Sequence, residues 1–317
     1  MYKTLSSGER RALYILNIIF EVEARKELDI ATLFIFDDIA DSFDYKNKYA
    51  IIQYLYELQQ YYTNSYQIIL THNFDFFRTI VARLGLSSDY ALYPEITKNS
   101  ITLSEMPYQR DLFKSWKENL NNNTSILIAS IPFMRNLSEY CNMKEEKKKL
   151  TALLHIKQET KDITVGDLEE IIKTMLHQDK PLKNNNLKSS EKVKDIIYNT
   201  ADKTVDAFQK NQDKDTYLLQ NKIVLSIAIR LKTEEFIIKE LQSDENKENC
   251  DNTSNQTSHL IKTYQKRYPD KNKEILTRVQ LITPENIHIN AFMYEPLLDT
   301  GYEILVKLYN DITKLKI

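Results

Sequence analysis

Residues 32–38 read TLFIFDD, and this stretch decides the fold class. Five successive β-prone residues that end in two aspartates are typical of a strand buried on both faces of a mostly parallel sheet. A helical pattern precedes the stretch at residues 10–23, where apolar residues recur every three or four positions. We therefore expect an interior parallel strand that follows a helix.

The next residues repeat the alternation of helix and strand. A helix is predicted over residues 47–62, a short strand over 66–70 and a further helix over 74–84. A strand, a crossover helix and a second strand in so short a stretch form a βαβ unit, which places the carboxyl ends of both strands on one side. The fold class expected for this part of the chain is α/β, with parallel strands and crossover helices.

Ionisable side chains follow both predicted strands. Asp37 and Asp38 end the first strand, and His72 comes just after the second. At such an edge one carboxylate can hold phosphate-bound Mg²⁺, another can orient or deprotonate water, and an imidazole can hydrogen-bond a γ-phosphate. An acidic turn and a structural histidine are the alternative interpretation of these residues.

Small polar residues stand immediately before the first helix. The backbone N–H groups of a helix N-terminus have no partner within the helix and lie at the positive end of its dipole, so they attract anions. The same residues also make an ordinary helix cap, and the pattern alone leaves both interpretations open. The residues concerned are Ser6, Ser7, Gly8 and Glu9.

Four short motifs resemble the carboxyl-terminal half of an ATP-binding-cassette (ABC) ATPase of the SMC/RecF-like type, a group that includes large AAA-type ATPases of bacterial defence systems. The motifs agree with the family in order and spacing, and they span about a quarter of the chain, residues 1–85. They are LSSGE at residues 5–9, TLFIFDD at 32–38, DSFD at 41–44 and LTH at 70–72.

The resemblance implies ATP and Mg²⁺ as cofactors and a role for each motif. Asp37 takes the Walker B position on Mg²⁺, Asp38 the catalytic-base position and His72 the switch-histidine position. Residues 41–44, which end in Asp44, correspond to the D-loop. The signature motif, which in this family contacts the γ-phosphate of ATP bound to the opposite protomer, corresponds to Ser6, Ser7, Gly8 and Glu9.

The chain departs from the family pattern in two ways. Asp38 stands where glutamate is usual, which is compatible with slow hydrolysis. A P-loop, GxxxxGK[ST], needs two glycines five positions apart, and these 317 residues contain no such pair. The four glycines are Gly8, Gly85, Gly166 and Gly301.

The missing P-loop predicts a partner. In this family the P-loop lies in an amino-terminal half, so the chain resembles one part of a truncated or split ATPase. A P-loop-bearing half or a second protomer is therefore the expected partner. We expect no ATP hydrolysis by the isolated chain, because the β- and γ-phosphates lose most of their ligands without the P-loop.

Length and a change of pattern predict two domains. Residues 1–105 form the ATPase part, which ends in a hairpin over residues 90–104. Residues 106–317 are predicted to form a mainly helical domain. Loops are expected near residues 182–192 and 243–258, because both segments are poor in apolar side chains.

A second functional hypothesis concerns the helical domain. Arg135 and Glu139 are four residues apart on a predicted helix, and His155 lies on the next helical segment. An arginine, an acid and a histidine can cleave a phosphodiester, and the set resembles that of ATPase-fused anticodon nucleases. An ordinary salt bridge beside an unrelated core histidine is the alternative. A third hypothesis treats the chain as a non-catalytic interaction protein or a degenerate remnant.

Composition favours a cytoplasmic location. The 43 Lys and Arg residues nearly balance the 45 Asp and Glu residues, so no global attraction to nucleic acid or membrane is expected. Two cysteines fit a reducing compartment, and no apolar run approaches the ~18 residues needed to span a bilayer. Nucleic acid stays open as a partner through the nuclease hypothesis. Residues 144–149, KEEKKK, are expected to form a solvated helix face and not a nucleic-acid track, because their charges are mixed.

Overall fold

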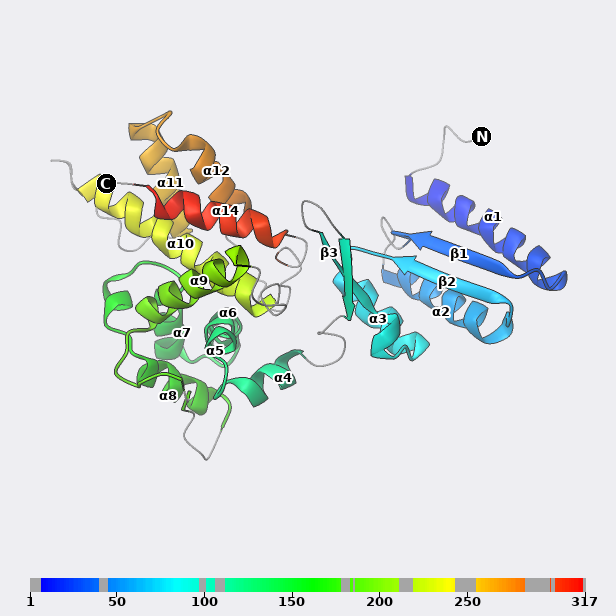
Figure 1. The fold of residues 1–317 in the computed structure, drawn as a ribbon, viewed down its shortest axis with the longest axis horizontal. Helices are drawn as coiled ribbons and strands as arrows, with labels where there is room; N and C mark the ends of the chain where they lie inside the picture. Colours follow the sequence, from blue (N-terminus) through cyan, green and yellow to red (C-terminus); the bar gives the residue numbers. More distant parts are fainter. Residues whose placement is uncertain are drawn as a thin grey trace. The chain divides into compact units, whose positions relative to one another are not determined.

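The chain forms two compact units in the computed structural model, Met1–Leu112 and Phe113–Ile317 (Figure 1). The division lies between residues 112 and 113, where the sequence predicted it after residue 105. The structure describes residues 7–39, 45–96, 101–105, 112–177, 183–184, 186–210, 219–242, 255–282, 297 and 300–315. None of the helices formed by these residues has the length and apolar character needed to span a bilayer.

The first unit contains the predicted βαβ arrangement. Strands β1 and β2 pair in parallel, with Thr32 opposite Ser65 and Asp37 opposite Leu70, which confirms the predicted strand direction. The hairpin strands β3 and β4 pair antiparallel and lie slightly later in the chain than predicted, because a short 3₁₀ turn takes residues 88–90. In order, the helices and strands are α1 (Ser7–Glu27), β1 (Thr32–Asp37), α2 (Tyr45–Tyr61), β2 (Ser65–Leu70), α3 (Phe74–Leu84), β3 (Leu92–Ile96) and β4 (Ile101–Glu105).

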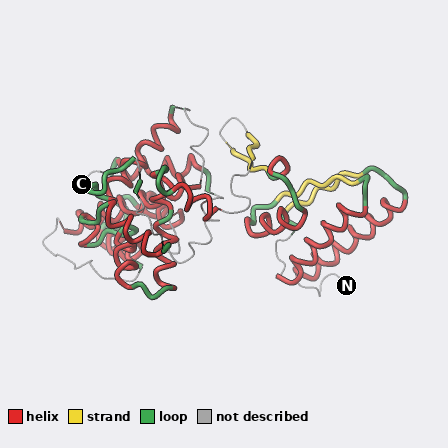
Figure 2. The backbone as a smooth tube through the Cα atoms, turned by 90° about the horizontal axis from the view of Figure 1, so that it is seen from below, coloured by secondary structure: helices red, strands yellow, loops and turns green. Residues whose placement is uncertain are grey.

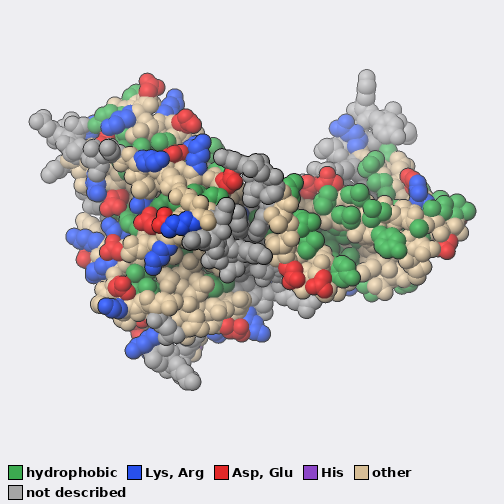
Figure 3. Space-filling view, viewed as in Figure 1, with side chains coloured by type: hydrophobic (Ala, Val, Ile, Leu, Met, Phe, Trp, Pro, Cys, Tyr) green, Lys and Arg blue, Asp and Glu red, His purple; other side chains and the backbone are tan. Residues whose placement is uncertain are grey.

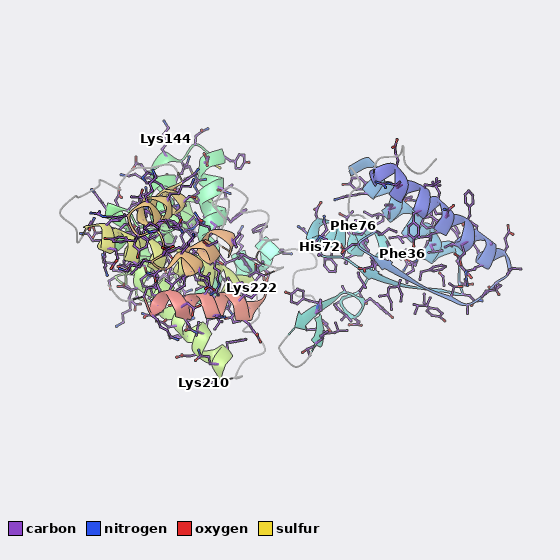
Figure 4. The ribbon with its side chains drawn as sticks, turned by 90° about the horizontal axis from the view of Figure 1, so that it is seen from above. Phe36, His72, Phe76, Lys144, Lys210 and Lys222 are labelled. Carbon is purple, nitrogen blue, oxygen red and sulfur yellow. The ribbon has the colours of Figure 1, made fainter. Side chains whose placement is uncertain are left out.

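One face of the β1–β2 sheet packs on all three helices. Phe36 of β1 is buried against Val22 of α1, Leu55 of α2 and Phe76 of α3. Phe36 and Phe76 lie between the sheet and the helices (Figure 4). This cluster is the hydrophobic core of the first unit.

The opposite face of the sheet, here called the open face, is apolar and exposed. Its large side chains are between 45% and 65% exposed, and they are Leu33, Ile35, Tyr66, Ile68 and Leu70. Hydrophobic side chains gather over β1 and β2 on the visible side of the unit (Figure 3). The prediction of an interior strand is therefore wrong for this face. A continuously apolar strand is suited to burial on both sides, whereas this unit covers only one.

The second unit is a helical bundle around α10 (Leu219–Gln242), which contacts α5, α9, α11, α12 and α14 (Figure 2). Most side chains of α10 are buried on every side, as expected for a helix that runs through a core. The other helices are α4 (Leu112–Asn119), α5 (Thr124–Ala129), α6 (Ile131–Tyr140), α7 (Lys144–Ala152), α8 (Val165–Met175), α9 (Val193–Gln209), α11 (Gln256–Arg267), α12 (Lys273–Ile282) and α14 (Tyr302–Thr313).

Local sequence signals explain several of these boundaries. Pro132 stands at the start of α6 and separates it from α5, because proline fits the first turn of a helix and not its interior. Thr164 caps α8 by accepting a hydrogen bond from the N–H of Asp167, whose side chain caps in return. The second predicted loop is expected to reach residue 258, but α11 begins at Gln256; residues 243–254 of that segment lie outside the described residues.

Alanine substitutions on the two faces of the sheet should differ in their effect on the stability of the first unit. Leu55→Ala removes a fully buried side chain and should destabilise the first unit by about 2–5 kcal/mol. Leu33→Ala, on the open face, should change its stability by no more than about 0.5–1 kcal/mol. Hydrogen–deuterium exchange of α2 measures both effects, and equal losses would show that the open face is buried in solution.

Candidate functional site

The predicted acidic and histidine residues meet at the carboxyl end of the β1–β2 sheet. The backbone N–H of Asp38 donates to the carbonyl of Leu70 at 2.9 Å and so continues the ladder beyond β1. Asp38 Oδ1 lies 2.9 Å from His72 Nδ1 and accepts a second hydrogen bond from the backbone N–H of His72 at 3.2 Å. The prediction that Asp37, Asp38 and His72 lie at one edge is confirmed, and we call these three residues the rim.

The backbone of Asp38 has an unusual conformation. Its φ is +46°, in the left-handed region that aspartate and asparagine enter more readily than other residues with a side chain. This turn brings the short carboxylate to the backbone N–H and the ring Nδ1 of His72. A glutamate would adopt this φ less readily, which gives a structural reason for the aspartate that stands at this position.

The carboxylate of Asp37 differs from that of Asp38. Asp37 is exposed at the end of the open face. Within the described residues its side chain has no hydrogen bond or ion pair. No cluster of three His, Cys, Asp or Glu side chains suited to a metal occurs in the described part of the chain. A lone carboxylate fits Mg²⁺ bound mainly by phosphate and water oxygens, because Mg²⁺ in such sites often takes only one or two protein carboxylates.

The turn from β2 to α3 positions His72. Asn73 caps α3, and its side chain accepts from the N–H of Phe76 at 2.9 Å. Thr71 Oγ1 accepts from the N–H of Asn73 at 3.1 Å. The sequence interpretation missed both residues, although an asparagine before an apolar helix is a recognisable cap.

The predicted signature lies at the start of α1. Because α1 begins at Ser7, residues Ser7, Gly8 and Glu9 form its first turn, ahead of the predicted helix start at residue 10. This turn and the carboxyl ends of β1 and β2 lie at the same end of the first unit (Figures 1 and 2). Ser6 and the predicted D-loop with Asp44 lie outside the described residues.

A groove of about 800 Å³ runs along the outer edge of β2 and ends at the rim. Residues of β2 and residues 90–92 and 94 line it, together with side chains of α3 such as Phe77, Ile80 and Leu84. Among the described residues, β2 pairs with β1 only. The groove therefore exposes unpaired strand edge beside an apolar surface.

The candidate nuclease residues of the second unit have different surroundings. Arg135 Nη1 donates to Glu139 at 2.6 Å, and Lys147 donates to the other oxygen of that carboxylate at 2.7 Å. The hydrogen bond from Lys147 and attraction to Arg135 hold the pKa of Glu139 below its usual value despite slight desolvation. Glu139 is therefore an ion-paired carboxylate at neutral pH and not an acid ready to donate a proton.

His155 is held by a buried carboxylate. His155 Nδ1 lies 2.7 Å from Oε1 of Glu234, which is fully buried in α10. Glu234 also accepts hydrogen bonds from Thr257, Gln256 and the backbone N–H of Ile156. Burial alone would raise the pKa of Glu234, but attraction and hydrogen bonding from His155, with the other donors, lower it. The network joins the loop after α7 to α10 and α11 and gives His155 a structural role.

The buried carboxylate should make the stability of the second unit depend on acid pH. A lowered pKa means that Glu234 stabilises the folded state above about pH 4.5, its ordinary pKa, and that this contribution is lost as the pH falls below it. Glu234→Gln should cost about 1–3 kcal/mol at pH 7 and should flatten the decline below pH 4.5. Urea unfolding followed by fluorescence of Trp116, the single tryptophan, measures this.

Glu274→Gln is the matched control, because Glu274 is an exposed glutamate in the first turn of α12. It should leave both the stability at pH 7 and the acid decline unchanged. An acid decline of the Glu234→Gln protein as steep as that of the wild type would contradict the assignment.

The chain shows no significant match to protein-family models, to curated proteins or to solved structures.

Proposed function

We propose that the first unit is one half of the nucleotide site of an ABC-type ATPase, which a P-loop-bearing half completes. The observation that carries this proposal is the rim. Two parallel strands bring Asp37, Asp38 and His72 to one edge, where Asp38 bonds His72 at 2.9 Å. The four motifs do not by themselves require this contact, so the geometry supports the resemblance independently.

Each rim residue has a chemical role that fits its surroundings. Asp37 would hold Mg²⁺, which would neutralise charge on the phosphates of bound ATP. Asp38 would accept a proton from the attacking water, and its carboxylate is oriented for this by the ring and the N–H of His72. The His72 side chain is 59% exposed and so is accessible to a phosphate oxygen.

The start of α1 would contribute an anion site to the same assembly. The helix α1 begins at Ser7, and the first N–H groups of an α-helix lie beyond the reach of its own carbonyl acceptors. They lie at the end of the unit that carries the rim, and the positive end of the helix dipole favours a phosphate there.

The exposed surfaces of the sheet support the need for a second half. Parallel sheets are ordinarily buried on both faces, whereas here the open face, which includes Leu33, Ile35 and Ile68, is exposed. The groove beside β2 offers strand-edge hydrogen bonds and an apolar wall, a combination that suits an added strand. A P-loop-bearing half that adds a strand at β2 would pair the free edge of that strand and could cover the open face. It would also bring phosphate ligands to the rim.

Hydrolysis should appear only in the assembled protein. The isolated chain should release no phosphate from ATP, and the addition of a polypeptide that contains GxxxxGK[ST] should produce turnover. Asp38→Asn should then lower kcat about 10²–10⁴-fold, because asparagine keeps the turn but cannot accept the proton. Phosphate release measures both.

Asp89→Asn is the control, because Asp89 is an exposed aspartate of the same unit that lines neither the rim nor the groove. It should leave turnover unchanged. Turnover by the isolated chain would contradict the division of the site. A complex that forms without turnover would favour the non-catalytic interaction protein.

A further inference from the structure

The second unit has a hollow of about 470 Å³, and half of its lining residues are lysines. It lies between α7 and the 3₁₀ turn Gln158–Lys161. Lysine side chains outnumber acids four to one among its lining residues, although the whole chain carries slightly more acids than bases. The lining residues are Lys144, Lys147, Lys148, Thr151, Ala152, Lys157, Gln158 and Glu159.

The lysines gather because of the helical repeat. Lys144, Lys147, Lys148 and Thr151 are three or four residues apart and therefore share one face of α7. Glu145 and Glu146 do not line the hollow, and Lys149 instead pairs with Asp167 at 3.5 Å. Residues 144–149 are largely exposed, as expected for a solvated helix face, and on this side of the helix the helical repeat separates bases from acids. Lys144 is labelled in Figure 4.

Two ion pairs hold part of the lysine array in place. Lys147 bonds Glu139 at 2.7 Å, and Lys148 bonds Glu159 at 2.7 Å. Arg135, which is only 13% exposed, donates to Glu139 and to Thr151 Oγ1 and thereby links the wall of the hollow to α6. Glu159 is the only acid among the lining residues. With Glu139, which pairs with Lys147 from outside the lining, four lysines meet two acids, an excess of two positive charges.

The lining specifies the class of ligand. Ala152 is its only apolar residue and no aromatic ring takes part, so the hollow offers no surface on which a base could stack. Lysine ammonium groups act as compact point charges for phosphate oxygens, without fixing their orientation. A row of such charges along a helix suits successive phosphates of one strand better than a single small anion.

We infer that this hollow binds the phosphate backbone of a single nucleic-acid strand, without reading its bases. The inference goes beyond the proposed ATPase function and does not depend on it. It also requires no nuclease chemistry at Arg135 or His155, whose bonds are described above.

The test is binding of fluorescein-labelled single-stranded poly(U) RNA to the full chain, measured by fluorescence anisotropy at several salt concentrations. Lys144 and Lys148 are exposed, so replacing both by glutamine preserves the fold. If each contacts one phosphate, the double variant should bind more weakly, and the slope of log K against log salt should fall by about 1.4.

Lys262→Gln/Lys266→Gln on α11 is the matched control, with the same change in net charge. It should leave the affinity and the salt slope near those of the wild type. Equal losses in the two double variants, or no RNA binding by the wild type, would overturn the inference. Binding of inorganic phosphate or ATP at the hollow without RNA binding would overturn it as well, because it would assign a small anion.

Discussion

The hydrogen bond between Asp38 and His72 is the contact on which the account of the first unit depends. It forms because β1 and β2 run parallel and in register, so that the residues after each strand leave the sheet side by side. The left-handed turn at Asp38 and the Asn73 cap then direct two side chains toward each other. The open carboxylate of Asp37 lies beside them, and the three side chains together form an edge suited to a metal-bound phosphate.

The same sheet is incomplete by the ordinary standards of parallel structure. One face of the sheet packs on helices, where Phe36 and Leu55 are buried, whereas Ile35 and Ile68 are exposed on the other face. The outer edge of β2 faces a groove and has no strand partner within the described chain. If the unit is half of a larger sheet, as we propose, the apolar open face and the groove are the surfaces that the other half would cover.

Much of this arrangement could be predicted from the sequence, because local patterns determine it. The run at residues 32–38 indicates a strand, the βαβ spacing sets its direction, and Pro132 and Thr164 mark helix starts. What could not be predicted depends on distant residues. The partner of His155 is Glu234 on α10, 79 residues away in the sequence. The apolar pattern of β1 does not show that one face of the strand is exposed in this unit. The lysine hollow is not evident from the sequence, because residues 144–149 carry charges of both signs. Only the helix face that each residue occupies separates the bases from the acids.

The most direct test of the central claim is hydrogen–deuterium exchange of β2, residues 65–70, with and without the P-loop-bearing polypeptide. Amides on the outer edge of β2 should exchange quickly in the isolated chain and become strongly protected in the complex, because an added strand would accept their hydrogen bonds. A complex that forms while the exchange of β2 stays unchanged would contradict the claim that the first unit is one half of a shared sheet.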